Sequence, residues 1–249
     1  MNLEGKTAVV IGASSGVGKA LARSLVAADA RVTAVARAPE GLSALRSELG
    51  PRIETVQADA ADAATAHKLV GELRPDFVVL TAGVRPQMGP IDELSWDAFS
   101  EAWNADTKAA FHLVQAALRA PLRSGSTVVI VSSGAAVNGS FLSGGYAGAK
   151  RMQWLMAGYA QKIADAKPLG IRFLAVVPRQ LIEGTAIAKL ASERYAQGLG
   201  ITPADYMKRF DVPLDSDKVA AGIVAGLRGE APANSTAVAV TGTGLELLT

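Results

Sequence analysis

The sequence contains no cysteine among its 249 residues. This absence excludes disulfide bonds, thiolate metal sites and a cysteine nucleophile. Charged residues are also scarce, at 19%, and 25 basic side chains nearly balance 23 acidic ones, so the net charge is only +2. Because no run is rich in lysine and arginine, we expect no nucleic-acid partner.

The sequence also lacks an apolar run long enough to cross a membrane or to direct secretion. The first apolar run, residues 8–11, already ends at Gly12. We therefore expect a cytoplasmic protein without a membrane partner. The two histidines, His67 and His112, lie in different predicted helices without a partner at metal-ligand spacing, so we expect no metal site.

Short runs rich in valine and isoleucine alternate with longer segments of helical period. This pattern predicts one domain over residues 1–249, an α/β fold with a doubly wound parallel sheet of about seven strands and helices on both faces. The predicted strands are 7–11, 31–36, 53–58, 77–80, 127–131, 172–177 and 237–240. The predicted helices are 17–29, 40–49, 61–73, 95–118, 146–167 and 216–227.

Residues 179–213 interrupt this alternation. No strand is predicted there, and the residues favour short helices at 186–195 and 203–209. An insertion near the end of such a sheet is well placed to act as a lid over a site at the strand ends. The alternative is a helical decoration at the periphery.

A glycine-rich turn follows the first predicted strand and opens the first helix. It includes Gly12, Ser14, Ser15, Gly16, Val17 and Gly18. Such a turn lets the backbone approach a pyrophosphate, and the helix N-terminus offers unpaired N–H groups to the phosphates. An ordinary turn between strand and helix is the alternative interpretation.

The end of the second strand indicates which nucleotide this turn accepts. NAD sites carry an acid there for the ribose hydroxyls. Here the strand ends at Arg37, and the first carboxylate is Glu40. Because a guanidinium can bind a 2′-phosphate through two hydrogen bonds, we predict NADP(H) in preference to NAD(H). A solvated arginine at a loop is the alternative.

Tyr146 and Lys150 are four residues apart at the start of a predicted helix, so both side chains lie on one face. A phenol becomes an acid–base catalyst near neutral pH when a nearby ammonium stabilises its phenolate form. Ser133 follows the strand 127–131 and could hydrogen-bond a substrate oxygen beside the tyrosine, with Ser132 as its competitor.

These motifs together resemble the short-chain dehydrogenase/reductase family in its compact form, over residues 6 to about 240. The matching residues are Gly12, Gly16, Gly18, Asp59 with Ala60, Ala82-Gly83, Asn104 (in Asn104-Ala105-Asp106), Ser133, Tyr146 and Lys150. The resemblance implies that Tyr146 is the general acid or base and that Ser133 positions the carbonyl oxygen. It further implies that Lys150 holds the nicotinamide ribose and assists Tyr146, and that Asn104 keeps a water in a proton relay.

The chain departs from the family pattern at three places. Ile11 replaces a usual threonine and Thr81 a usual asparagine, and we expect both to alter hydrogen bonds near the glycine turn only. Pro178 matches the cofactor site, but Arg179 stands where the family usually has glycine. We hypothesise that Arg179, with Arg85 at the same mouth, favours an anionic substrate; Arg179 pointing to solvent is the alternative.

The sequence thus predicts an oxidoreductase that moves a hydride between NADP(H) and a carbonyl or alcohol group of a small molecule. A cofactor-binding sensor or partner-binding module whose catalysis has faded is the alternative, and isomerisation or dehydration in the same site is a third. Apolar residues of the predicted helices 95–118 and 146–167, including Trp96, Trp103, Phe111 and Trp154, favour a subunit interface. The family resemblance implies that such an interface would build a homodimer or homotetramer.

Overall fold

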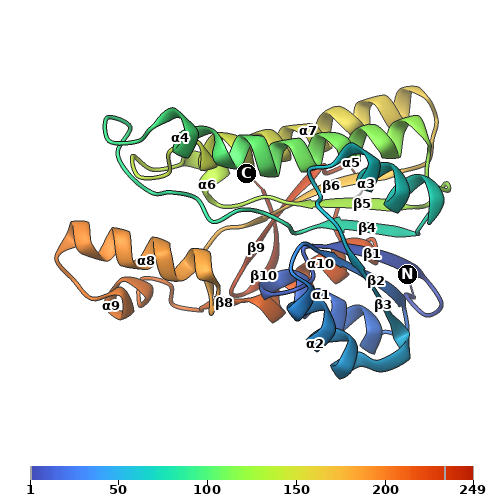
Figure 1. The fold of residues 1–249 in the computed structure, drawn as a ribbon, viewed down its shortest axis with the longest axis horizontal. Coiled ribbons are helices and arrows are strands. Elements are labelled where there is room, and N and C mark those ends of the chain that lie inside the picture. The colour runs from blue at the N-terminus through green and yellow to red at the C-terminus, as the bar shows by residue number, and fades with distance from the viewer. Residues whose placement is uncertain (1, 233, 249) are drawn as a thin grey trace.

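A sheet of eight strands forms the middle layer of the computed structural model, which describes residues 2–232 and 234–248 (Figure 1). The strand order is β10-β9-β6-β5-β4-β1-β2-β3, and every neighbouring pair is parallel except β9 and β10. The strands are β1 (Thr7–Ile11), β2 (Arg31–Ala36), β3 (Ile53–Gln57), β4 (Phe77–Leu80), β5 (Thr127–Val131), β6 (Arg172–Pro178), β9 (Ala237–Thr241) and β10 (Gly244–Leu247).

The central strands are apolar throughout because both of their faces are covered. All residues of β4 and β5 are buried, without the alternation that a half-exposed strand shows. Successive residues of β1 belong to different cores: Val9 packs into the core on one face of the sheet and Val10 into the core on the other. The sheet therefore separates two hydrophobic cores.

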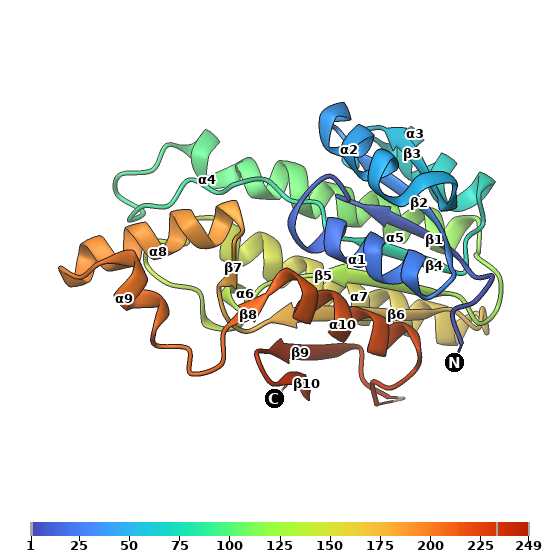
Figure 2. The ribbon, with the colours of Figure 1, turned by 90° about the horizontal axis from the view of Figure 1, so that it is seen from below.

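Helices cover the two faces in separate groups (Figures 1 and 2). One face carries α1, α2 and α10, and the other carries α3, α5 and α7. The helices are α1 (Gly16–Ala27), α2 (Pro39–Leu49), α3 (Ala63–His67), α4 (Trp96–Ala102), α5 (Lys108–Arg119), α6 (Ala135–Asn138), α7 (Tyr146–Ala166), α8 (Ala186–Leu199), α9 (Pro203–Met207) and α10 (Ser216–Leu227). None of the helices in the described part of the chain has the length and apolar character that a membrane crossing requires.

The strand order reverses between β1 and β4, since the chain runs outward through β2 and β3 and then returns to β4. In open sheets of this kind the carboxyl ends of the strands leave a crevice at the reversal point. The fold therefore places the glycine turn after β1 and the turn after β4 beside each other. Ala82 N donates a hydrogen bond to Ile11 O (2.9 Å), which joins the two turns directly.

The predicted fold class is confirmed, with corrections at several elements. The sheet has an eighth strand, β10, which the sequence did not reveal because its residues are only partly buried. The expected helix 95–118 consists of α4 and α5 joined by a π-helical turn (Trp103–Thr107). The expected helix 61–73 likewise continues from α3 into a π-helical turn (Lys68–Glu72).

The segment 179–213 also contains more than helices. A short strand β7 (Ile182–Glu183) pairs in parallel with β8 (Leu214–Asp215), so the two ends of the segment are tied together. Between them α8 and α9 lie beyond the carboxyl ends of the strands of the main sheet (Figures 1 and 2). The helical insertion that the sequence predicted is therefore present, and a strand pair closes its base.

Candidate active site

A cleft of about 460 Å³ lies at the carboxyl ends of the strands, over the point where the strand order reverses. Every residue predicted to bind the cofactor lines it: Gly12, Ser14, Ser15, Gly16, Val17, Gly18, Arg37, Asp59, Ala60, Ala82, Gly83, Tyr146, Lys150 and Pro178. Residues that the sequence did not single out complete its wall, including Leu181, Ile182 and Thr185 from the insertion. The cleft thus brings together segments far apart in the chain.

The glycine turn has the geometry of a backbone cradle. Gly12 has φ +98°, and a Cβ added there would lie 2.5 Å from Ala82 N. Any side chain at this position would therefore displace the neighbouring turn. The N-terminus of α1 opens onto the same cleft, with no acidic residue in its first turn to oppose an anion.

Thr81 ties this cradle to the sheet. Its hydroxyl donates to Ile11 O (2.9 Å), the same carbonyl oxygen that accepts from the backbone N–H groups of Thr81 and Ala82. The threonine hydroxyl thus holds the end of β4 against the end of β1. The expectation that the departures at Ile11 and Thr81 affect local hydrogen bonding agrees with this arrangement.

Arg37 and Asp59 lie at the opposite end of the cleft, where β2 and β3 end. The Arg37 side chain is exposed, and no salt bridge joins it to an acid in residues 2–232 or 234–248. Asp59 accepts a hydrogen bond from Ala61 N (2.9 Å), which shapes the turn after β3. A guanidinium is therefore available at this end for an anionic group.

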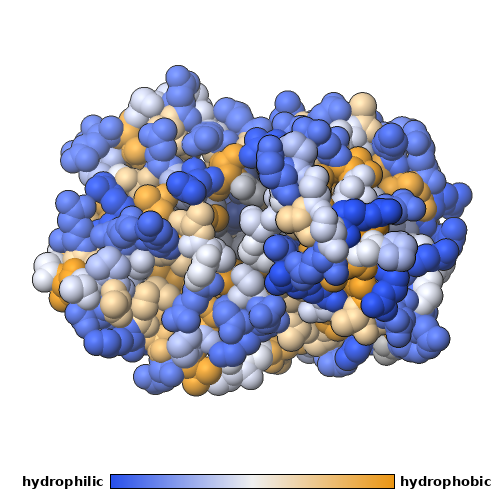
Figure 3. All heavy atoms as spheres, turned by 60° about the horizontal axis from the view of Figure 1, so that its bottom comes forward, coloured by the Kyte–Doolittle hydropathy of each residue, from blue (hydrophilic) through white to orange (hydrophobic). Residues whose placement is uncertain are grey.

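A second pocket of about 520 Å³ adjoins the cleft beneath the insertion. The two cavities share five lining residues: Ser133, Tyr146, Gln180, Leu181 and Ile187. The surface is hollowed near its middle, between the part that carries α8 and the part that carries α1 and α2 (Figure 3). A ligand in the cleft and a ligand in the second pocket would therefore meet at Ser133 and Tyr146.

Tyr146 and Lys150 occupy the first turns of α7, as their spacing predicts. The Lys150 Nζ lies 5.5 Å from the centroid of the Tyr146 ring. The Ser132 hydroxyl donates to Lys150 O (2.7 Å) and is thus engaged with α7, while Ser133 lines both cavities. This placement favours Ser133 over Ser132 as the group that contacts a substrate.

Lys150 is the centre of a buried polar cluster that the sequence did not predict. Its Nζ lies 2.9 Å from Asp106 Oδ2 and donates to Gln153 Oε1 (3.0 Å). The Asp106 side chain is 0% exposed, and its Oδ1 accepts from Val84 N (2.8 Å). A Cβ on Gly83 would lie 2.8 Å from Asp106 Oδ2, so glycine leaves room for this ion pair.

Two effects of opposite sign act on the Lys150 ammonium. Burial alone would lower the pKa of Lys150, but the Asp106 carboxylate and Tyr146 together raise it above its ordinary value. Lys150 is therefore held in its charged form. That charge is compensated by Asp106 rather than left entirely to the neighbouring tyrosine.

The expected position of Asn104 in this site is wrong. Its side chain is exposed, its Nδ2 donates to Ser100 Oγ (3.3 Å), and it does not line the cleft. Asp106, two residues further along the π-helical turn, faces the cleft instead. Residues two apart on a helix point to nearly opposite sides, which is why only one of the two reaches Lys150.

Arg85 and Arg179 do not line one mouth, as the sequence suggested. Arg85 lines the cleft, whereas Arg179 lines the second pocket. Both side chains are exposed. The position of Arg179 keeps it among the residues that a substrate could meet, and Arg85 lies on the other side of the shared wall.

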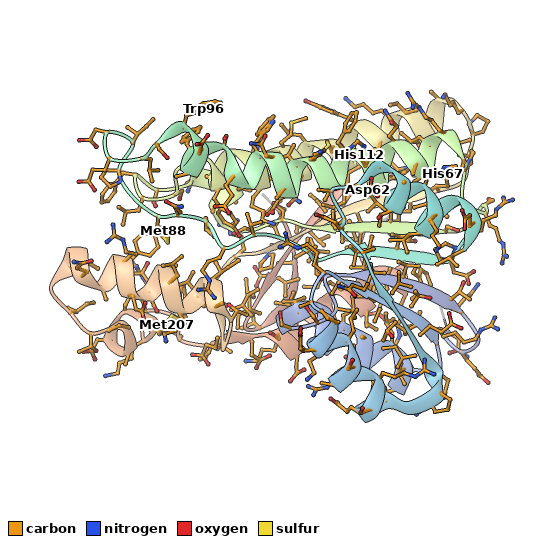
Figure 4. All side chains as sticks on the ribbon, in the orientation of Figure 1. Asp62, His67, Met88, Trp96, His112 and Met207 are labelled. Carbon is orange, nitrogen blue, oxygen red and sulfur yellow. The ribbon has the colours of Figure 1, made fainter. Side chains whose placement is uncertain are left out.

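The histidines lie away from both cavities. His67 belongs to α3 and His112 to α5, on the helical layer above the sheet (Figure 4). Across residues 2–232 and 234–248, no group of three or more histidine, aspartate or glutamate side chains is arranged to hold a metal ion.

Comparisons with known proteins agree with this architecture. The family model described as short chain dehydrogenase matches residues 6–195. The chain is 29% identical to the 3-oxoacyl-[acyl-carrier-protein] reductase FabG of Escherichia coli over 216 residues, 82% of this chain and 84% of that protein. It is 35% identical to the short chain dehydrogenase/reductase AacuD of Aspergillus aculeatus over 156 residues, but spans only 55% of that protein and 60% of its own length.

Among solved structures, a short-chain dehydrogenase/reductase of Brucella melitensis, described as glucose/ribitol dehydrogenase, is similar with a TM-score of 0.81. It is 25% identical, and the match covers 97% of each chain. The family match extends over more than half of the sequence and includes the glycine turn, Ser133, Tyr146 and Lys150. The chain therefore belongs to the short chain dehydrogenase family of oxidoreductases.

Proposed function

We propose that this protein is an NADP(H)-dependent reductase or dehydrogenase that interconverts a carbonyl and an alcohol on a small molecule. One observation carries the proposal: Ser133 and Tyr146 form a wall shared by a glycine-lined cleft and a second pocket. A cofactor in the first cavity and a substrate in the second would meet there.

The residues of the cleft fit a dinucleotide phosphate. The Gly12 cradle and the N-terminus of α1 would hold the pyrophosphate, and Arg37 would hold a 2′-phosphate on the adenosine ribose. Asp59 and Ala60 would border the adenine, while Pro178 would lie at the nicotinamide end. When bound, the cofactor supplies the hydride in reduction or accepts it in oxidation.

The chain's own residues provide the proton chemistry. In reduction the Tyr146 hydroxyl gives its proton to the substrate oxygen, and in oxidation the phenolate takes a proton from the alcohol. Ser133 donates a hydrogen bond to the same oxygen and fixes its position. Lys150 stays charged beside the Tyr146 ring, with Asp106 and Gln153 fixing its position.

The proposal includes an anionic substrate and a homodimer or homotetramer. Arg179 lines the second pocket, so an acid group on the substrate would meet a cation there. Exposed aromatic side chains on the outer helices, Trp103 and Phe111, support self-association, because both are 49% exposed. The cytoplasmic location remains an expectation from the sequence.

One observation favours the alternative of a cofactor-binding module with faded catalysis. Asp106 compensates the charge of Lys150, which weakens the effect of the ammonium on Tyr146. The complete set of Ser133 and Tyr146 at the shared wall, with Lys150 lining the cleft beside them, favours the enzyme.

The variant Tyr146→Phe distinguishes an active enzyme from a cofactor-binding module without catalysis. We expect the variant to bind NADPH with unchanged affinity in calorimetry while its turnover of carbonyl compounds falls at least ~100-fold, since general acid catalysis contributes about that much. A sensor would keep its response to its partner. Unchanged turnover in Tyr146→Phe would refute the proposed proton transfer.

A further inference from the structure

The second pocket has a charge character that the proposed reaction does not require. Three arginines line it: Arg179, Arg194 and Arg209. No aspartate or glutamate belongs to its lining in the described part of the chain. The proposed reaction binds the substrate carbonyl through Ser133 and Tyr146 alone. If the arginines contact the ligand, they therefore contact a different part of it.

Arg194 and Arg209 are distinct from Arg179 in their surroundings. The Thr241 hydroxyl does most to lower the pKa of Glu246, and the Arg179 charge makes a smaller contribution in the same direction. Arg194 and Arg209 form no salt bridge with an acid within residues 2–232 and 234–248. Arg179 forms none within the same residues either, so all three cations of the pocket lack a salt-bridge partner there.

The Arg194 guanidinium is partly buried and only partly satisfied. One terminal nitrogen donates to Gln197 Oε1 at 3.3 Å, while its Nε is buried without a hydrogen-bond partner among the described residues. An unpaired buried donor on a charged group is costly unless a ligand accepts from it. Arg194 is therefore prepared for an acceptor that enters the pocket.

Arg209 is held by a stack of aromatic rings. Its guanidinium carbon lies 4.5 Å from the centroid of the Tyr206 ring, and Tyr206 stacks on Tyr195 with centroids 5.4 Å apart. The Tyr195 hydroxyl in turn shares a hydrogen bond with Ser140 Oγ (2.7 Å) on the opposite side of the pocket. Stacking over a ring leaves the in-plane N–H groups of a guanidinium free to bind an anion.

The rest of the lining is largely apolar or aromatic, with the polar side chains of Ser140, Ser143 and Gln180 among it. The apolar lining comes from three segments: Met88 from the segment between β4 and α4, Leu142 from the loop before α7, and Leu199 and Phe210 from the insertion. Met88 projects from the segment that passes over the insertion (Figure 4). A ligand that fills this pocket would place an apolar body between a reacting end and a charged end.

We propose that the second pocket is an acid-recognition subsite: Arg194 and Arg209 bind a carboxylate on the far end of an apolar or aromatic carbonyl substrate. The position of the substrate carbonyl at Ser133 and Tyr146 rests on the proposed function, whereas binding of the carboxylate by the arginines does not depend on it. The insertion thereby selects organic acids from neutral carbonyl compounds of the same size.

The test is a binding measurement with two ligands of matched shape, biphenylcarboxylate and biphenylmethanol. In calorimetry on the wild-type protein we expect the acid to bind about 10- to 100-fold more tightly, which is the range that hydrogen bonds to a charged group supply. Arg194→Gln and Arg209→Gln should each remove most of this preference and leave binding of the alcohol unchanged. Lys189→Gln is the matched control, because Lys189 is an exposed cation on α8, the helix that carries Arg194, and does not line the pocket.

Equal binding of acid and alcohol to the wild type would overturn the subsite, whatever the variants do. A preference that survives in both arginine variants would overturn the assignment to these residues. Because this assay needs no turnover, failure of the proposed reaction is recognised separately, by the absence of NADPH oxidation with any carbonyl compound. Circular dichroism melting curves confirm that each variant is folded.

Discussion

Asp106→Asn is the most informative single change, because Asp106 lies at the centre of a buried ion pair beside Tyr146 and Lys150. The carboxylate accepts from Val84 N with one oxygen and contacts Lys150 Nζ with the other. An asparagine has one carbonyl oxygen and one NH₂ group, so it can accept from only one of these donors. The other donor would face the NH₂ group.

The stability lost in Asp106→Asn can be estimated from the distance between the Lys150 and Asp106 charges and from their burial. Two charges 2.9 Å apart attract by about 6 kcal/mol at an effective dielectric constant of about 20. Breaking a buried pair by removing one partner costs about 3–5 kcal/mol, because the remaining charge stays buried. For a chain of 249 residues this lowers the melting temperature by on the order of 10 °C.

The same reasoning predicts how the difference in stability between the wild type and Asp106→Asn depends on pH. Burial lowers the pKa of Lys150 in the folded protein, but Asp106 and Tyr146 together prevail and raise it. This contribution to stability is present below the pKa of an unfolded lysine and is lost as the pH rises through the folded value. In Asp106→Asn burial prevails and lowers the pKa of Lys150, so stability increases as the pH rises. The gap between wild type and variant should therefore narrow at alkaline pH.

Chemical denaturation of both proteins at several pH values measures this gap. Asp29→Asn serves as control, because Asp29 forms an exposed salt bridge with Arg52 and its φ of 59° suits asparagine. We expect the control to denature like the wild type at every pH. A stability of Asp106→Asn equal to that of the wild type, or a gap that does not change with pH, would refute the reasoning.

Two further predictions concern the sheet and the outer helices. Burial alone would raise the pKa of Asp76, but hydrogen bonds from Thr7 N–H and Oγ1 and from Lys6 prevail and lower it. Asp76→Asn should lower the free energy of unfolding by about 1–2 kcal/mol at pH values above the pKa of an unfolded aspartate. In urea denaturation this loss should shrink as the pH falls through the pKa of Asp76 in the folded protein. A loss that stays constant down to low pH would contradict this. Phe111→Glu should shift the protein toward monomer in sedimentation experiments, whereas a wild-type monomer over a wide concentration range would contradict self-association through this face.

The sequence predicted the parallel strands well because most of them are short apolar runs rich in valine and isoleucine, and the central ones, such as β4 and β5, are buried along their whole length. It also predicted the i, i+4 pair of Tyr146 and Lys150, which depends only on helix geometry. It missed the partner of that pair. Asp106 lies within a π-helical turn, and no local pattern in the sequence predicts such a turn.

A signal for Asp106 was nevertheless present in the helical period. Asp106 precedes Ala109, Ala110 and Leu113 at spacings of three, four and seven, so it lies on the buried face of α5. An acid on a buried helical face requires a cation, and Lys150 lies on the facing helix. The sequence could not place Arg194 and Arg209 in the second pocket in this way. Both come to line that pocket only because of how α8 and α9 fold back over it.

The central claim is that the cleft binds NADP(H), and calorimetric titration of the wild type and Arg37→Ala with NADPH and NADH tests it most directly. We expect the wild type to bind NADPH more tightly than NADH. In Arg37→Ala the affinity for NADPH should fall about 10-fold or more, since a charge-assisted hydrogen bond is worth about 1.5–3 kcal/mol, while NADH binding stays the same. Equal affinity of the wild type for both cofactors would contradict the role of Arg37, and binding of neither would contradict the account of the cleft.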